Sequence, residues 1–372
     1  MIHATWSRGD LIEITERGPI HPGRQRGAGH AIPGATRRRA PEPPWQPATM
    51  RFIVYGAGAI GGVLGGRLHQ AGQDVMLIAR GEHLHRIRRD GLRLEDPETT
   101  ATLPIPAVAS PAEIDWRDGD VVLLAIKTNG TAAALADLAA AAGPDVPVCC
   151  VQNGVANERL ALRHFGTVYG VCVMMPAGHL EPGVVQAYSV PTTGILDLGR
   201  YPSGVDAGAT ALAERLAAAT FVAQPRPDIM RWKYRKLLMN LANAVGALVA
   251  DDDSDEAVTL IDAARAEGET VLAAAGVDVV SMAEDRERRG EILRITRFGR
   301  TRAGSSSWQS LYRGTGSVET DYLNGEIVLL GRLTGVPTPV NELLRRRSNE
   351  LARTGGAPAS LRAADLHAAL GG

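Results

Sequence analysis

Six consecutive residues have the spacing of a phosphate-binding turn. Gly56-Ala57-Gly58-Ala59-Ile60-Gly61 reads G-x-G-x-x-G, directly after an apolar run and at the start of a stretch with helical spacing. The first glycine permits the tight turn, the second lets a pyrophosphate approach the backbone, and the third lets the helix pack closely on the strand. Free N–H groups at the helix start favour an anion. We therefore predict that these residues bind a dinucleotide.

The end of the second predicted strand distinguishes between the two nicotinamide dinucleotides. Arg80 stands about 20 residues beyond the turn, where NAD-binding chains carry an Asp or Glu for the ribose 2′-hydroxyl. An acid repels a 2′-phosphate, whereas a guanidinium pairs with it in a bidentate manner. The residue type favours NADPH/NADP+, with a solvated strand-end arginine as the alternative. Three neighbouring arginines are further candidates for this role: Arg86, Arg88 and Arg89.

A predicted helix over 229–249 carries the candidate catalytic group. Lys236, Asn240 and Asn243 have the spacing i, i+4, i+7 and would share one face of an otherwise apolar helix. Buried without partners, such groups are costly, so a cleft with a polar ligand is one explanation and a solvent-facing stripe is the other. A partly desolvated lysine has a lowered pKa and can donate a proton to a developing alkoxide.

Polar residues at other predicted strand and helix ends are weaker candidates. Lys127 and Asn153 follow apolar strands, where open α/β sheets bind ligands, and either is a candidate for contacting ribose, nicotinamide or substrate, or for forming a polar turn. The serine run 305–307 has the composition of a helix cap or of a carboxylate site. Glu319 has the position of an acid favoured in a first helical turn.

Alternating strand and helix patterns predict a doubly wound parallel sheet, that is, an α/β Rossmann domain, followed by an all-α C-terminal domain. Strands are expected at 51–55, 74–80, 120–127 and 147–153, with shorter strand-like pieces between 167 and 199. Helices are expected at 59–71, 131–142, 229–249, 255–275, 319–334 and 340–353. We place the NADP-binding Rossmann domain at 50–224 and the helical substrate domain at 225–372. Residues 1–49, rich in Pro and Gly, are expected to be a disordered tail or a mis-started extension, with a basic interaction tail as the alternative.

Net charge, apolar content and cysteine count limit the kinds of partner that the chain is expected to bind. The formal net charge is −1, which offers no electrostatic case for nucleic acid or an anionic membrane, and no apolar run is long enough to span a bilayer. Three cysteines without regular spacing indicate neither a disulfide framework nor a metal site, so we predict no metal and a reducing, cytoplasmic compartment.

Taken together, these motifs resemble the ketopantoate reductase (2-dehydropantoate 2-reductase) family, from residue 50 to about 353. Six segments carry the resemblance: GAGAIGG at 56–62, Arg80, AIKTN at 125–129, VQNG at 151–154, KLLMN at 236–240 and ETDYLNG at 319–325. The resemblance implies a Rossmann domain and a helical domain that reduce 2-dehydropantoate to (R)-pantoate with NADPH, in the route to pantothenate and coenzyme A.

The resemblance also implies roles for single residues. Lys236 matches the family's proton donor to the keto oxygen, and Lys127 matches the lysine near the cofactor ribose. Asn153 matches the asparagine that contacts both cofactor and substrate, and Glu319 matches a glutamate that contacts the cofactor. The substrate side is matched by Asn240, by Asn243 one position before the usual asparagine, and by Ser307, with Ser306 as the alternative for the substrate carboxylate.

Departures from the family pattern surround the acyl pocket. Position 244 is Ala, Trp308 stands where Met is frequent, and the acidic run 251–253 follows the catalytic helix. Reduction of ketopantoate is therefore the first expectation. The alternatives are a relative that reduces another 2-keto acid or carbonyl substrate, a low-turnover NADP-binding regulatory protein, and an NADP-dependent hydroxy acid dehydrogenase working in the oxidative direction. Pairing of helical domains into a homodimer is left open.

Overall fold

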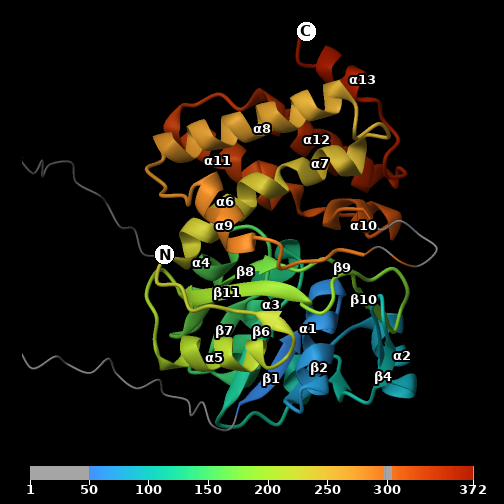
Figure 1. Cartoon of the computed structure of the whole chain (residues 1–372), viewed down its shortest axis with the longest axis vertical. Coiled ribbons are helices and arrows are strands. Elements are labelled where there is room, and N and C mark those ends of the chain that lie inside the picture. Colours follow the sequence, from blue (N-terminus) through green and yellow to red (C-terminus); the bar gives the residue numbers. More distant parts are fainter. Residues whose placement is uncertain (1–49, 297, 299–303, 372) are drawn as a thin grey trace, which may run out of the picture. The chain divides into compact units, whose positions relative to one another are not determined.

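An eight-stranded, mainly parallel sheet organises the N-terminal half of the computed structural model, which describes residues 50–296, 298 and 304–371. The strand order is β12-β11-β8-β7-β6-β1-β2-β5 (Figure 1). The parallel series contains β1 (Arg51–Tyr55), β2 (Asp74–Ile78), β5 (Ala107–Val108), β6 (Asp120–Leu124), β7 (Val148–Cys150) and β8 (Val168–Met174). At the far edge, β11 (Gly194–Arg200) runs antiparallel to β8 and β12 (Phe221–Val222) runs parallel to β11. The predicted doubly wound sheet is confirmed, and the predicted tail at 1–49 lies outside the described residues.

Helices cover both faces of this sheet because alternate residues of each strand point to opposite sides. Phe52 and Val54 share a core with α1 (Ala59–Gln70) and α5 (Ala207–Ala217). Ile53 and Tyr55 belong to a second core. That core includes side chains of α3 (Thr131–Ala142) and α4 (Asn157–Leu162).

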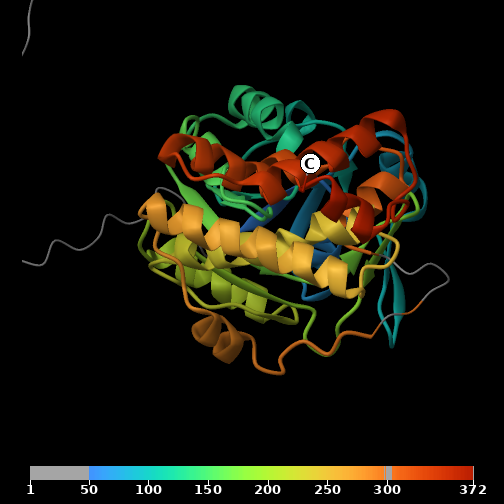
Figure 2. The same cartoon turned by 90° about the horizontal axis from the view of Figure 1, so that it is seen from above.

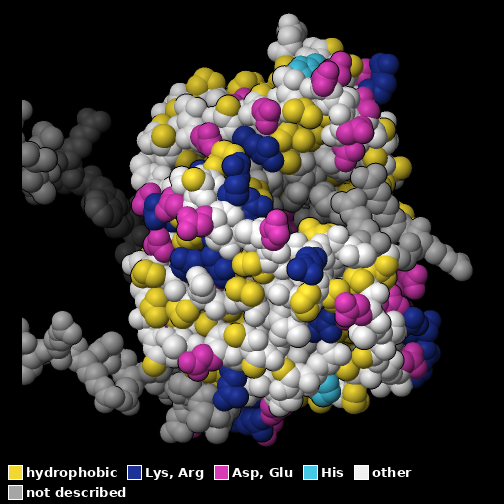
Figure 3. Space-filling model, viewed as in Figure 1, with side chains coloured by type: hydrophobic (Ala, Val, Ile, Leu, Met, Phe, Trp, Pro, Cys, Tyr) yellow, Lys and Arg dark blue, Asp and Glu magenta, His cyan; other side chains and the backbone are white. Residues whose placement is uncertain are grey.

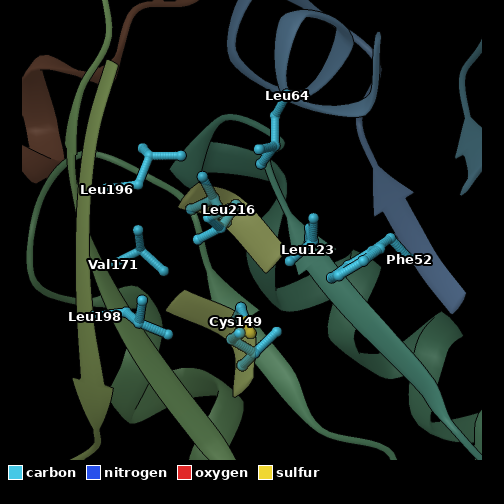
Figure 4. A pocket seen from close by; sticks show the side chains of 10 residues that line it. Phe52, Leu64, Leu123, Cys149, Val171, Leu196, Leu198 and Leu216 are labelled. Atoms are coloured by element: carbon cyan, nitrogen blue, oxygen red, sulfur yellow. The ribbon is translucent and has the colours of Figure 1, made fainter. Parts of the chain in front are cut away.

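The core beneath α1 and α5 is closely filled. Leucine side chains from both helices, β6 and β11 converge with Val171 of β8 on one apolar gap (Figure 4). Its volume is about 10 Å³, near the minimum that holds one water molecule. This gap is therefore a packing defect of the core and has no room for a substrate.

A second, four-stranded sheet packs on the other side of α1 and was not predicted. It has the order β4-β3-β10-β9. Its strands are β3 (Leu92–Glu95), β4 (Thr100–Leu103), β9 (Ala177–Gly178) and β10 (Val184–Ala187). A Cβ on Gly62 would lie 2.6 Å from Val185 of this sheet, and one on Gly65 would lie 2.8 Å from Leu77 of the main sheet. The glycine-rich α1 thus allows both sheets to approach it closely.

The C-terminal half is helical, as predicted. Figures 1 and 2 show α6 (Ile229–Asn240), α7 (Ala242–Leu248), α8 (Asp255–Ala274), α11 (Asn324–Thr334) and α12 (Pro339–Thr354) grouped together. They share a core that contains Leu237, Leu241, Leu260, Ile327 and Leu344. Three shorter helices complete this half: α9 (Met282–Arg289), α10 (Ser306–Tyr312) and α13 (Ala363–Ala368). In the N-terminal half, α2 (Gly81–Asp90) follows β2. The face drawn in Figure 3 has interspersed basic and acidic side chains.

The predicted helix at 229–249 is two helices that meet at Leu241. The carbonyl of Leu241 accepts a hydrogen bond from Asn324 Nδ2 at 3.3 Å. A side chain inserted into the backbone ladder is a recognised cause of a helix break. Asn240 therefore ends α6 and Asn243 lies on α7. Leu241 between them keeps the right-handed helical conformation, with φ −58° and ψ −31°, so the shared polar face stays a prediction. The described residues belong to a unit that spans 41–372, and the expected domain boundary at 224/225 stays a prediction.

Candidate functional site

The glycine turn has a geometry suited to phosphate. Gly56 has φ +105°, and a Cβ there would lie 2.7 Å from Ile126 Cγ2, so a larger residue is excluded. A Cβ on Gly61 would lie 2.0 Å from the Gly56 carbonyl oxygen. Around Gly58, in contrast, a Cβ would meet nothing within 4 Å. This open position precedes α1, whose first N–H groups have no side-chain cap. The turn can therefore receive an anion at the start of the helix.

Arg80 follows β2 and is the N-cap residue of α2. Its side chain is 71% exposed and lies 3.9 Å from Asp137, too far for a strong ion pair in solvent. The guanidinium is also close enough to Tyr55 to oppose the rise in that hydroxyl's pKa, which burial causes. The alternatives Arg86, Arg88 and Arg89 are each paired with a carboxylate of Glu82, Glu113 or Asp90. Arg80 is thus the most weakly paired of these four arginines.

The loop after β6 is joined to the helical half by hydrogen bonds. Lys127 Nζ donates to Ser310 Oγ at 2.5 Å, and Glu319 Oε1 accepts from the N–H and the hydroxyl of Thr128 at 2.9 and 3.1 Å. Burial, and then repulsion by Arg313, lower the pKa of Lys127 to about 8. Lys127 and Glu319, which the sequence placed near the cofactor, are therefore brought together by this loop, and each already has a protein partner.

The loop after β7 contains Asn153, which is half-buried. No hydrogen bond of its side chain occurs among the described residues, while its carbonyl oxygen accepts from Asn157 Nδ2 at 3.1 Å. The neighbouring Gln152 donates from Nε2 to Ile126 O and Thr131 Oγ1. Asn157 also donates to Thr128 Oγ1 at 3.3 Å. The loops that end β6 and β7 thus form one network that leaves the Asn153 amide available to a ligand.

The two polar side chains of α6 that the sequence singled out lack protein partners. Lys236 Nζ forms no hydrogen bond or ion pair within the described part of the chain, and burial lowers its pKa despite nearby Cys172 and Asp285. Asn240, one turn later, is 5% exposed, and its Nδ2 is buried without a hydrogen bond. Unsatisfied buried groups of this kind are rare and costly, which is consistent with a ligand site.

Lys233, three residues before Lys236, is a buried cation that sequence reasoning missed. Its Nζ donates to Gln152 O at 2.9 Å and to Val171 O at 3.1 Å, and lies 2.7 Å from Glu158 Oε1. The side chains of Lys233 and Glu158 are 2% and 0% exposed. The available signal was the recurrence of lysine one turn before Lys236, and nothing in the sequence pointed to Glu158. Through the Gln152 carbonyl, this pair holds α6 against the loop that carries Asn153.

The remaining predicted substrate residues lie on α7 and α10. Ser305, not Ser306 or Ser307, caps α10, and its Oγ donates to Asn243 O at 3.1 Å. Ser307 is buried, and its hydroxyl has no hydrogen bond among the described residues. Ser306 accepts from Ser310 through its carbonyl. Neither side chain has a hydrogen bond among the described residues, so the structure does not choose between the two serine candidates.

Two kinds of feature are absent from the described residues. Within 50–296, 298 and 304–371, no three His, Cys, Asp or Glu side chains are grouped so as to hold a metal ion. Over the same residues, no helix has the length and apolar character to cross a membrane.

Comparison with known proteins connects this geometry to a family. Residues 52–202 match the model of ketopantoate reductase PanE/ApbA, and residues 228–351 match the model of its C-terminal region. A 2-dehydropantoate 2-reductase of Pyrococcus horikoshii is 31% identical over 309 residues, covering 79% of this chain and 95% of that protein.

Solved structures agree with this assignment. A PanE/ApbA family ketopantoate reductase from Ralstonia eutropha has a TM-score of 0.68 and 27% identity, over 82% of this chain and 99% of that one. D-mandelate dehydrogenase, solved with NADH and anilino(oxo)acetate, shares the fold with a TM-score of 0.70 and 24% identity, over 82% and 99%. The chain is therefore an oxidoreductase that acts on CH–OH groups, and it belongs to the ketopantoate reductase family.

Proposed function

We propose that this protein reduces 2-dehydropantoate to (R)-pantoate with NADPH, as a step toward pantothenate and coenzyme A. The observation that carries the proposal is the pair of unpartnered side chains on α6, Lys236 Nζ and Asn240 Nδ2. The names of the curated relatives supply the substrate, and the similarity to them extends over nearly their whole length. The predicted cytoplasmic location and the homodimer remain parts of this hypothesis.

NADPH fits the residues present. The glycine turn 56–61 would receive the pyrophosphate, the weakly paired Arg80 the 2′-phosphate, and Lys127, Asn153 and Glu319 the neighbouring groups. Bound NADPH would supply a hydride to the keto carbon. D-mandelate dehydrogenase was solved with NADH, so the preference for NADPH rests on Arg80 alone.

The chain's own residues would bind the keto acid and move a proton. Asn240, Asn243 and Ser307 would hold the substrate carboxylate and hydroxyl, and Asn153 would orient both reactants. Lys236 would donate its proton to the keto oxygen as negative charge develops there. Its lowered pKa favours this role, because a proton donor works best when its pKa is near the working pH. Lys233 and Glu158 would position Asn153 without touching the substrate.

A panel of 2-keto acids assayed with NADPH and with NADH tests the proposal. We expect the highest kcat/KM for 2-dehydropantoate with NADPH, and an Arg80→Met variant that loses the preference for NADPH over NADH. Oxidation of NADPH by none of the keto acids, with tight NADPH binding, would instead identify a low-turnover regulatory protein.

A relative that acts on a different 2-keto acid is the second candidate. It is favoured by Ala at position 244 and by Trp308, whose ring stacks on Tyr312 at 5.0 Å and so adds an aromatic surface near the serine candidates. The same panel would reveal it as a higher kcat/KM for an aromatic or bulkier 2-keto acid than for 2-dehydropantoate. Preferred oxidation of a 2-hydroxy acid with NADP+ would identify a dehydrogenase.

A further inference from the structure

The helix α10 connects the helical half to the strand ends near the glycine turn. Its Ser310 accepts from Lys127 at the end of β6, and its Gln309 Nε2 donates to Ala177 O of β9 at 3.2 Å. Arg313 follows as the C-cap residue, with Nε donating to Gln309 O at 3.2 Å. Arg313 is therefore anchored at the end of a helix that contacts both β6 and β9.

Two histidines extend this line of contacts to the turn. His83 Nε2 lies 2.7 Å from the carbonyl oxygen of Ala57, and its Nδ1 accepts from the Gly183 N–H at 2.8 Å. The proton therefore resides on Nε2, and the ring is neutral. The His179 ring lies 4.3 Å from the His83 ring, centroid to centroid. Because His179 is two residues beyond Ala177, α10, both rings and the turn are neighbours.

Two basic side chains lie here, Arg313 and Lys127, and among the described residues the one acid that acts on them is Glu319 beside Lys127. Burial is the main cause that lowers the pKa values of Lys127, His83 and His179, the last to about 4, and the Arg313 guanidinium lowers all three further. Burial also lowers the pKa of Arg313 itself, and no carboxylate pairs with it among the described residues. Glu319 is the acid beside Lys127, but its Oε1 is bonded to Thr128. A half-buried guanidinium in such surroundings is stabilised by an anion.

We propose that Arg313 binds the pyrophosphate of the dinucleotide held by the glycine turn, so that the helical half supplies part of its counter-charge. The inference rests on the proposed cofactor. The pyrophosphate is favoured over the 2′-phosphate because the contacts of α10 lead through Ala177 and the two histidines to Ala57 inside the turn, whereas Arg80 stands at the end of β2. Arg313 is not among the residues that the family resemblance implicated.

Calorimetric titration of the full chain with NADPH, 2′-phospho-ADP-ribose and 2′-AMP tests this assignment. Only the first two ligands contain a pyrophosphate. We expect Arg313→Met to bind both about tenfold more weakly, the size typical of one lost charge-assisted hydrogen bond, and to bind 2′-AMP unchanged. Arg313→Lys should bind NADPH with an affinity between those of the unaltered protein and Arg313→Met, because the charge remains but the planar fork is lost.

Arg347→Met is the matched control, since Arg347 is an exposed arginine paired with Glu350 on α12. It should bind all three ligands like the unaltered protein, and equal melting temperatures would show that both variants fold. Unchanged NADPH affinity in Arg313→Met overturns the assignment, as does equal weakening of 2′-AMP. A raised KM for the keto acid with normal NADPH affinity would place Arg313 at the substrate carboxylate instead. Failure of the unaltered protein to bind NADPH would contradict the proposed function itself.

Discussion

Two lysines one turn apart on α6 have opposite surroundings. Lys233 is enclosed by two carbonyl oxygens and the Glu158 carboxylate, with its side chain 2% exposed. Lys236 is half-buried and has no hydrogen-bond partner within the described residues, and burial lowers its pKa. On the same helix, the ammonium of Lys233 thus has all its partners within the protein, whereas that of Lys236, three residues later, has none among the described residues.

The different surroundings of the two lysines indicate different roles, one structural and one chemical. An ammonium whose donors are all taken up by the protein holds its neighbours together, whereas one with no protein partner can give its proton to a ligand. Glu158 also depends on Lys233, because apart from this ion pair neither of its oxygens has a partner among the described residues. We infer that Lys233 contributes mainly to stability and Lys236 mainly to turnover.

The largest effect is expected on turnover when Lys236 is replaced. Lys236→Met should lower kcat by about 10²–10⁴-fold, the usual contribution of a general acid, with NADPH affinity nearly unchanged. The melting temperature should stay equal or rise. Because the folded-state pKa is lowered, the unfolded chain holds the proton more tightly, so the charged lysine disfavours folding below its unfolded pKa. Steady-state kinetics with thermal melting checks both; near-normal kcat would remove Lys236 from its role.

Lys233→Met should reverse this pattern. Removing one partner leaves a buried, uncompensated carboxylate, a change that costs about 3–5 kcal/mol of unfolding free energy. Denaturant unfolding measures this loss, and a Lys233→Met/Glu158→Gln double variant should recover part of it. If the single variant melts normally and loses only kcat, the separation between the two lysines is wrong.

Replacement of Asn240 tests whether the unpartnered side chains of α6, Lys236 and Asn240, contact the substrate. Asn240→Leu removes an amide whose Nδ2 is buried without a partner, so stability should hold or improve. The KM for the keto acid should rise about tenfold, the value of a hydrogen bond to a charged group. Unchanged KM for every keto acid tested would indicate that Asn240 faces away from the substrate.

The smallest effect concerns pH. Lys127 has a pKa of about 8, so below that pH its charge would attract an anionic cofactor, and the attraction would be lost as the pH rises through 8. We expect NADPH to bind a few-fold more weakly at pH 9 than at pH 7. A Lys127→Met variant should flatten that change; a slope that persists in this variant would assign the titration to another group.

Much of the fold could be predicted because its signals are local. The pattern of β1, the glycine turn and α1 appeared where expected, since glycine spacing and apolar periodicity act over a few residues. The break at Leu241 could not be predicted, because the side chain that hydrogen-bonds its carbonyl, Asn324, lies 83 residues away in the chain. The second sheet likewise depends on β3 and β10, which lie far apart in the chain.

The candidate site divides in the same way. Residue type and spacing singled out Lys236, Asn240 and the turn at 56–61, because the chemistry of an amine, an amide or a free backbone N–H belongs to the residue itself. The tertiary structure alone decided which lysine is enclosed and which amide is left without a partner. It also decided that α10, which ends at Arg313, connects to Ala57 through β9 and two histidines. Burial and pairing depend on segments brought together by folding, and a linear sequence does not contain those distances.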